Sequence, residues 1–231
     1  MKLPNKLLKK AFAATLPVMA GYLVLGMGFG ILLRTKGYGP LWAFAMSFFI
    51  YAGSMQYLAI DLLTGGASLI AAALTTLMVN ARHLFYGISM VEGYKGMGKK
   101  KPYAIFALTD ETYSLVCQDD QHPDPKSFHS YAFWVSLFDQ CYWVAGSMIG
   151  SLLGGVIPFD VTGIDFSLTA LFVTVFIEQW LSTKDHLSAV IGVAASVACV
   201  VIFGADGFLI PAMIVILVSL TALRAVRKEA A

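Results

Sequence analysis

The sequence predicts an all-α, polytopic membrane protein that folds as a helical bundle. Of its 231 residues, 58% are hydrophobic and only 13% are charged, whereas a soluble globular domain carries about 25% charged residues. The apolar stretches also continue over helix lengths, and about 20 helical residues are enough to cross a hydrocarbon core. We therefore expect one transmembrane domain over residues 1–231.

The composition and motifs exclude several classes of function. The net charge is only +2 and the positive residues gather at segment ends, so nucleic acid is not expected as a partner. Cys117, Cys141 and Cys199 lie in apolar surroundings without metal-ligand spacing, which indicates packing residues and no metal site. Residues 93–99 match the start of a phosphate-binding loop, but the Ser or Thr that should follow Lys99 is missing. Since no catalytic metal motif or nucleophile elbow is present either, we expect neither an enzyme nor a cofactor.

The first apolar segment, at about 12–33, predicts a retained membrane helix, because it is longer than the apolar core of a signal peptide. Gly26 and Gly30 form a small-xxx-small pair, which lets another helix approach closely. Pro17 and the repeated glycines also weaken a helix. The alternative is therefore a break that exposes backbone groups to a substrate.

The second segment, at about 40–63, carries polar residues on two faces. On a continuous helix Ser54 shares a face with Tyr51, whereas Gln56 lies about 200° away from Ser54. Both Ser54 and Gln56 can address one cavity if the helix unwinds near Gly53. We therefore expect a break there.

The third segment, at about 67–91, contains Asn80, Arg82 and His83 within an apolar run. An Arg at the bilayer centre costs roughly 2.5–3.5 kcal/mol on insertion scales, so these residues should face protein or water. If the helix is continuous, Asn80 and His83 share one stripe, and Arg82 points elsewhere, towards Tyr86. One helix thus offers two polar faces.

The fourth segment, at about 103–118, is interrupted by Thr109, Asp110 and Glu111. Acids directly after a Thr are typical of a helix N-terminus, where they satisfy backbone N–H groups and complement the helix dipole. A helix that begins at membrane depth is a feature of discontinuous transporter helices. This segment is the second candidate for a break.

The C-terminal half is more uniformly apolar. A long segment at about 130–157 is followed by spans at about 166–182, 186–203 and 207–224. Gly146, Gly150 and Gly154 recur every four residues in the long segment, which predicts close packing against another helix of this chain or a partner subunit. We expect an interfacial position for Glu178 and Gln179.

Charge bias constrains the topology. Lysines at the N-terminus, the basic 95–101 loop and the basic C-terminus should all be cytoplasmic. Three full crossings before Lys95 would place that loop outside, so one early segment must break or turn back. Non-helical backbone is tolerated at membrane depth only inside protein or beside a wet cavity. We expect about six to eight membrane segments, two of them broken or re-entrant, meeting near Asn80 and His83.

Three motifs in this order, at 52–56, 80–86 and 109–111, resemble the AzlC-type branched-chain amino acid permeases, the large subunits of bacterial branched-chain amino acid exporters. The resemblance covers nearly the whole chain in length and in order of segments. It implies a transporter of the bacterial cytoplasmic (inner) membrane that exports valine, leucine, isoleucine and similar apolar amino acids. It also implies a small AzlD-type membrane subunit as partner. No residue roles come with it, so the site is argued from the residues alone.

An apolar amino acid needs donors for its carboxylate, acceptors for its ammonium and an apolar wall for its side chain. Arg82 or the helix start at Thr109 can meet the carboxylate. The full set of candidate binding residues is Tyr51, Gly53, Ser54, Gln56, Asn80, Arg82, Phe85, Tyr86 and Thr109, with Asp110 and Glu111 as further acceptors for the ammonium. The candidates for proton coupling are His83, Asp110 and Glu111.

Simpler roles remain open for the same residues. Arg82 can pair with Asp110 or Glu111 and hold helices in register, His83 can be a hydrogen-bonded structural residue, and Asn80 can cap or bridge helices. The whole chain can also be a membrane scaffold whose partner carries out transport. The glycine repeat fits a scaffold equally well, but the charged centre favours a transporter.

Overall fold

The computed structural model describes residues 3–117, 124–156, 185–204 and 208–229, together with positions 163, 166, 169, 170, 173, 176, 177, 180, 181 and 183. Within these residues the chain forms helices and connecting turns and contains no strand, which confirms the all-α prediction. The chain divides into two compact units, Met1–Leu168 and Thr169–Ala231, and each is described by itself.

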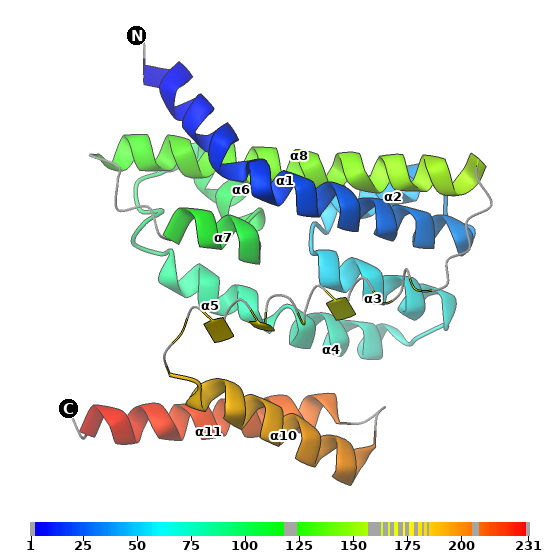
Figure 1. The fold of residues 1–231 in the computed structure, drawn as a ribbon, viewed down its shortest axis with the longest axis vertical. Coiled ribbons are helices and arrows are strands. Elements are labelled where there is room, and N and C mark those ends of the chain that lie inside the picture. Colours follow the sequence, from blue (N-terminus) through cyan, green and yellow to red (C-terminus); the bar gives the residue numbers. More distant parts are fainter. Residues whose placement is uncertain are drawn as a thin grey trace. The chain divides into compact units, whose positions relative to one another are not determined.

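The first unit is organised around two long helices, α1 (Leu3–Thr35) and α8 (Pro125–Val156) (Figure 1). They run parallel, because residues later in α1 contact residues later in α8. The Phe12 and Phe138 ring centroids lie 5.5 Å apart. Further along, Gly30 packs on Ser147 and its neighbours. Helix α1 continues through Pro17 without interruption, so the alternative of a break in this segment is wrong.

Glycines allow α1 and α8 to touch backbone to backbone. A Cβ added at Gly30 would lie 2.1 Å from the carbonyl oxygen of Ser147, and one at Gly150 would lie 2.1 Å from that of Met27. Real Cβ atoms do not approach other atoms so closely. The glycine repeat of the long segment therefore packs within this chain, against α1, which settles the choice between internal and external packing.

The segment expected to break near Gly53 consists of two helices, α2 (Pro40–Phe49) and α3 (Gly53–Thr64), so this break is confirmed. Between them Tyr51 has a φ of +45°, in the left-handed region that side chains other than Gly rarely adopt. Such a conformation costs roughly 1–3 kcal/mol and persists only where the surroundings enforce it. Tyr51 is held by burial, with 4% of its surface exposed.

The α2–α3 pair reaches the middle of α8 and then turns back. At the end of α2 the Phe48 carbonyl accepts a hydrogen bond from Gln140 Nε2 at 3.0 Å. Helix α3 then returns along α1, because the Tyr57 hydroxyl donates to the Leu25 carbonyl at 2.7 Å and Ile60 packs in one cluster with Leu33. The pair thus begins and ends near the C-terminal end of α1.

The second expected break is also present, between α6 (Lys101–Phe106) and α7 (Asp110–Cys117). The 3-10 turn η1 (Gly98–Lys100) directly precedes α6. Near the start of α6 the Lys100 ammonium lies 4.8 Å from the Phe133 ring centroid. At the start of α7 Thr112 bonds to Asp139, and further along Val116 packs in one cluster with Val135. This pair therefore reaches mid-α8 from the opposite end and turns back.

The segment expected as one straight helix consists of α4 (Leu69–Val79) and α5 (Ala81–Ser89), which are bent by 51° at Asn80. The expectation of a continuous stripe through Asn80 and His83 is therefore wrong. Asn80 adopts φ −91° and ψ 3°, a conformation between helix and turn that Asn tolerates well. Helix α4 contacts α3 and helix α5 contacts α7, so the bent segment joins the two broken ones.

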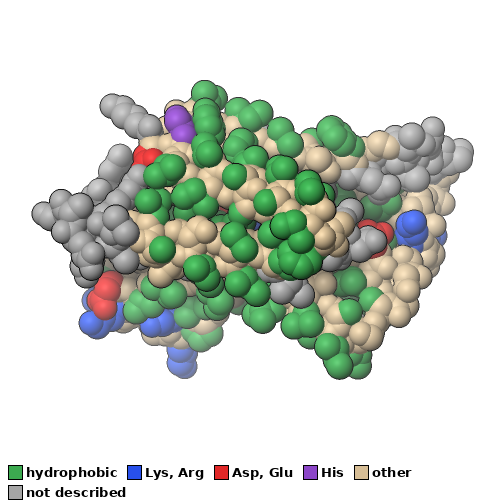
Figure 2. Space-filling view, turned by 90° about the horizontal axis from the view of Figure 1, so that it is seen from below, with side chains coloured by type: hydrophobic (Ala, Val, Ile, Leu, Met, Phe, Trp, Pro, Cys, Tyr) green, Lys and Arg blue, Asp and Glu red, His purple; other side chains and the backbone are tan. Residues whose placement is uncertain are grey.

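The second unit contains α10 (Leu187–Phe203) and α11 (Leu209–Glu229), which pack on each other. Large apolar side chains such as Val197, Val201 and Val218 are more than half exposed. Figure 2 shows a face crowded with hydrophobic side chains. The span expected at 166–182 lies largely outside the described residues, and Glu178 and Gln179 lie outside them altogether.

Among the described residues one helix, Lys6–Thr35, is both long and apolar enough to cross a membrane, or two if the bent α4–α5 pair is counted as one span. The expected number of membrane segments and the single domain stay predictions.

The glycine contact makes a direct prediction about stability. We expect Gly30→Ala to lower the apparent melting temperature of the detergent-solubilised protein, because overpacking costs typically about 1–3 kcal/mol. Gly21→Ala on the same helix is the matched control, since a Cβ there meets nothing within 4 Å. An alanine in an exposed helix interior should be neutral or stabilising. Equal melting temperatures for the two variants would contradict the close α1–α8 contact.

Candidate functional site

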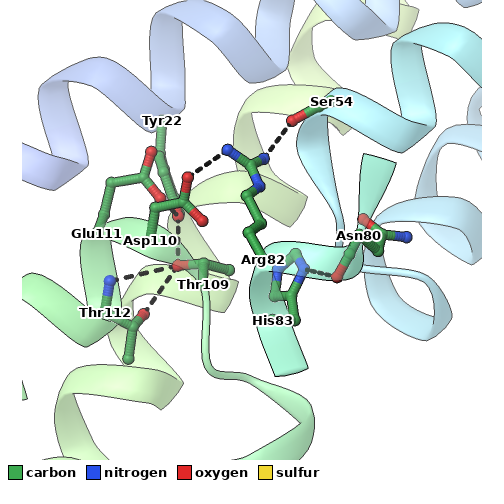
Figure 3. Close-up of polar contacts among 9 residues, drawn as sticks. All are labelled: Tyr22, Ser54, Asn80, Arg82, His83, Thr109, Asp110, Glu111 and Thr112. Atoms are coloured by element: carbon green, nitrogen blue, oxygen red, sulfur yellow. Dashed lines mark hydrogen bonds and ion pairs between the residues drawn. The ribbon is translucent and has the colours of Figure 1, made fainter. Parts of the chain in front are cut away.

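Three helices begin at the point where the broken segments meet. Ser54 is the second residue of α3, Arg82 is the second residue of α5, and Asp110 is the first residue of α7. The Arg82 guanidinium donates to Ser54 Oγ at 2.6 Å and forms an ion pair with the Asp110 carboxylate (Figure 3). We call these three residues the arginine cluster. Its ion pair is accessible, since 32% of the Arg82 side chain and 21% of the Asp110 side chain are exposed.

Three helix N-termini converge on the arginine cluster. Each helix N-terminus presents free N–H groups and the positive end of the helix dipole. Thr109 accepts the Thr112 backbone N–H at 3.3 Å, as expected of a residue that caps α7. Asp110 and Glu111 in the first turn complement this dipole. The cluster can therefore hold a negative group beside Arg82 and a positive group beside Asp110.

A second group of polar side chains links α1, α7 and α8. The Tyr22 hydroxyl donates to Glu111 Oε2 at 2.6 Å and lies 2.8 Å from Thr109 Oγ1. Thr109 Oγ1 donates to Thr112 Oγ1 at 3.1 Å, and Thr112 Oγ1 donates to Asp139 Oδ2 at 2.8 Å. We call these five residues the hydroxyl chain, of which Figure 3 shows all but Asp139.

Sequence reasoning placed Thr109 and Glu111 in the site but missed the other three members of the hydroxyl chain. Asp139 carried a usable signal, because it is an acid within the apolar 130–157 segment. Tyr22 and Thr112 carried none, since a Tyr or Thr on a membrane helix is unremarkable without knowledge of its neighbours.

Gln56 lies in a separate group that the structure does not bring to the arginine cluster. Its amide donates to Ser47 Oγ at 3.1 Å and accepts from Trp143 Nε1 at 2.9 Å, and Ser47 donates to Ser147 Oγ at 2.7 Å. The reason is geometric: α3 is regular from Gly53 onward, so Ser54 and Gln56 still face different sides. The break moves the helix start but does not turn Gln56 towards Arg82.

Asn80 and His83 lie beside the arginine cluster without joining it. His83 Nδ1 is 3.2 Å from the Asn80 carbonyl oxygen, and Figure 3 shows the Asn80 amide pointing away from Arg82. Tyr86 stacks on Tyr113 with ring centroids 4.7 Å apart. The side chain of Phe85 lies outside the described ones.

Tyr51 joins the two breaks. Its ring centroid lies 6.3 Å from the ring centroid of Phe106, the last residue of α6. Gly53 packs against the Trp143 ring, and a Cβ there would lie 3.0 Å from it.

Over the part of the chain that the structure describes, no group of three or more His, Cys, Asp or Glu side chains is arranged to hold a metal ion.

Comparison with known proteins identifies relatives over most of the chain. Residues 17–157 match the family model described as "AzlC protein". The chain is 45% identical over 216 residues to the Bacillus subtilis "Branched-chain amino acid transport protein AzlC", which covers 94% of this chain and 85% of the relative. It is 42% identical to an "Uncharacterized membrane protein" of Haemophilus influenzae, covering 92% and 87% of the two chains. It is 27% identical to the Escherichia coli "Inner membrane protein YgaZ", covering 82% and 79%. No solved structure matches the chain.

The buried Gln56 amide gives a prediction about stability. Gln56→Leu leaves Trp143 Nε1 without its acceptor, which costs about 1–3 kcal/mol. We expect a lower melting temperature in detergent. In the double variant Gln56→Leu/Trp143→Phe the loss should be smaller than the sum of the single losses, since both partners of one bond are removed. Full additivity of the two losses would contradict the bond.

Proposed function

The chain belongs to the AzlC family of membrane proteins, and from this premise we propose that it is a secondary transporter that exports branched-chain amino acids. The substrates are valine, leucine, isoleucine and similar apolar amino acids, the driving force is an inward proton gradient, and the site of action is the bacterial cytoplasmic membrane. A small AzlD-type membrane subunit is the proposed partner.

The observation that carries the proposal is the meeting of two broken segments at an accessible ion pair. Discontinuous helices with their N-termini at the substrate are a recurring device of secondary transporters. Here α3 and α7 both begin beside Arg82. A charged residue within an apolar segment is costly in lipid. Such residues therefore seldom face lipid and often mark a transport pathway.

The arginine cluster is complementary to a zwitterion. The substrate carboxylate would bind the Arg82 guanidinium and the free N–H groups at the start of α3, since guanidinium and helix N-termini both favour anions. The substrate ammonium would bind Asp110. Binding thus exchanges one internal ion pair for two pairs with the substrate. Tyr86 of α5, which stacks on Tyr113 of α7, would supply the apolar wall.

The parallel course of α1 and α8 supports a topology with two re-entrant segments. Two spanning helices that run in the same direction need an odd number of crossings between them. If α2–α3 and α6–α7 each return to the side where they started, the bent α4–α5 pair supplies that one crossing. Three further spans after α8 then place both chain ends and the 95–101 loop in the cytoplasm, giving about six crossings as the charge bias requires.

Substitution of Arg82 tests the proposal. We expect Arg82→Ala and Asp110→Asn to reduce valine efflux from proteoliposomes roughly 10- to 100-fold, since a hydrogen bond to a charged group contributes about 1.5–3 kcal/mol. Reconstitution includes the small partner, and efflux is normalised to folded protein. Wild-type efflux by Arg82→Ala would show that the cluster does not bind substrate.

An exposed ion pair of the same chain is the matched control. Lys95 and Glu92 pair at 3.4 Å with 75% and 80% of their side chains exposed. Because such surface pairs contribute little, Lys95→Ala should retain full efflux. The competing function, a scaffold for a transporting partner, predicts efflux by the small subunit alone and no effect of any Arg82 variant on transport.

A further inference from the structure

The hydroxyl chain contains one more link than its hydroxyl groups can fill. Its five oxygen atoms, from Glu111 Oε2 to Asp139 Oδ2, are joined by four contacts of 2.6, 2.8, 3.1 and 2.8 Å. Each hydrogen bond needs one proton, and each hydroxyl supplies one. Three hydroxyls therefore supply three protons for four links. If both carboxylates were ionised, one contact would bring two lone pairs together.

One added proton completes the chain. With a carboxylic acid at Glu111, every group donates to the next one in the direction of Asp139. With the acid at Asp139, every group donates in the direction of Glu111. The two arrangements contain the same atoms and the same net charge, and differ only in the direction of four hydrogen bonds.

We infer that Glu111 and Asp139 share one proton through Tyr22, Thr109 and Thr112, and that this shared-proton chain is the proton-binding site of the transporter. Transfer from Glu111 to Asp139 proceeds as each hydroxyl accepts one proton and releases its own to the next oxygen. No group in the interior of the chain gains or loses a proton overall. The inference rests on the proposed function for its role in transport, but the chain itself stands on geometry.

Burial favours a single charge on this pair. Asp139 is fully buried, and its second oxygen, Oδ1, has no hydrogen-bond partner among the described residues. A buried carboxylate without compensating bonds is costly, and sharing a proton with Glu111 removes one of the two negative charges. Of the residues expected from sequence to carry the proton, Glu111 belongs to the hydroxyl chain, whereas His83 and Asp110 do not.

Other ionisable groups face the two ends of the chain unequally. Glu111 lies near Asp110 and Arg82, the ion pair that the substrate would open. Asp139 lies near the hydroxyls of Tyr51 and Tyr103, and Tyr51 is also near Glu111. Substrate charge therefore acts mainly on the Glu111 end, which gives binding at the arginine cluster a way to move the proton.

Removal of single hydroxyls tests the inference. Tyr22→Phe and Thr112→Val each remove one oxygen from the hydroxyl chain, and so break the two links made by that oxygen, without changing side-chain volume much. We expect both variants to retain exchange of labelled valine across the membrane at equal pH. We expect both to lose valine efflux driven by a pH gradient by at least about tenfold, because a positioned proton transfer contributes 10²-fold or more. Tyr57→Phe, which removes another buried hydroxyl bonded to the Leu25 carbonyl, is the control and should retain both activities.

Infrared spectroscopy separates failure of this inference from failure of the proposed function. Purified wild-type protein at neutral pH should show the C=O band of a buried carboxylic acid. The band should disappear in Glu111→Gln or Asp139→Asn, and shift in Tyr22→Phe. If the wild type has the band but moves no branched-chain amino acid, the function is wrong and the shared proton stands. Absence of the band, or gradient-driven efflux in both hydroxyl variants equal to that of wild type, overturns the shared proton.

Discussion

The close contact between α1 and α8 is the constraint on which the rest of the first unit depends. Because Gly30 and Gly150 lack side chains, the two backbones touch, and Tyr22 on α1 comes within reach of α7 and α8 partners. The contact also fixes Trp143, which stacks on Phe29 and packs against the start of α3. A wider separation of these helices would leave the hydroxyl chain and the break at Gly53 without support.

Both broken segments start their second helix at mid-α8, and this arrangement explains how a mostly apolar chain can keep charged groups in its interior. The breaks free backbone N–H groups, and these together with Arg82 can interact with acidic groups. Asp110 pairs with Arg82, whereas Glu111 and Asp139 accept hydrogen bonds from hydroxyl groups. The charged pair suits a zwitterionic substrate, and the hydroxyl chain suits a mobile proton, so the two chemical tasks fall to adjacent but separate groups.

Sequence reasoning predicted the fold class and the breaks near Gly53 and Thr109, because each rests on local signals: apolar length, capping residues and the cost of a charge in lipid. It expected the two broken segments to meet near Asn80 and His83, whereas in the structure they meet at Arg82. It did not predict the bend at Asn80, since Asn is compatible with both helix and turn and no local signal decides between them. It grouped Gln56 with Ser54, whereas tertiary packing against Trp143 holds Gln56 elsewhere. Tyr22 and Asp139 are distant in sequence from the motifs, and only the packing of α1 on α8 brings them to Thr109 and Thr112.

Labelling of single cysteines from one side of the membrane tests most directly whether the two broken segments turn back. In a variant whose native cysteines are replaced by Ser, cysteines are placed at the exposed positions Lys36, Ala67, Lys95 and Lys126. A membrane-impermeant thiol reagent added outside intact cells should label Lys36→Cys and Ala67→Cys but neither Lys95→Cys nor Lys126→Cys. Labelling of Lys36→Cys and Ala67→Cys from opposite sides would mean that α2–α3 crosses the membrane, and would contradict the account.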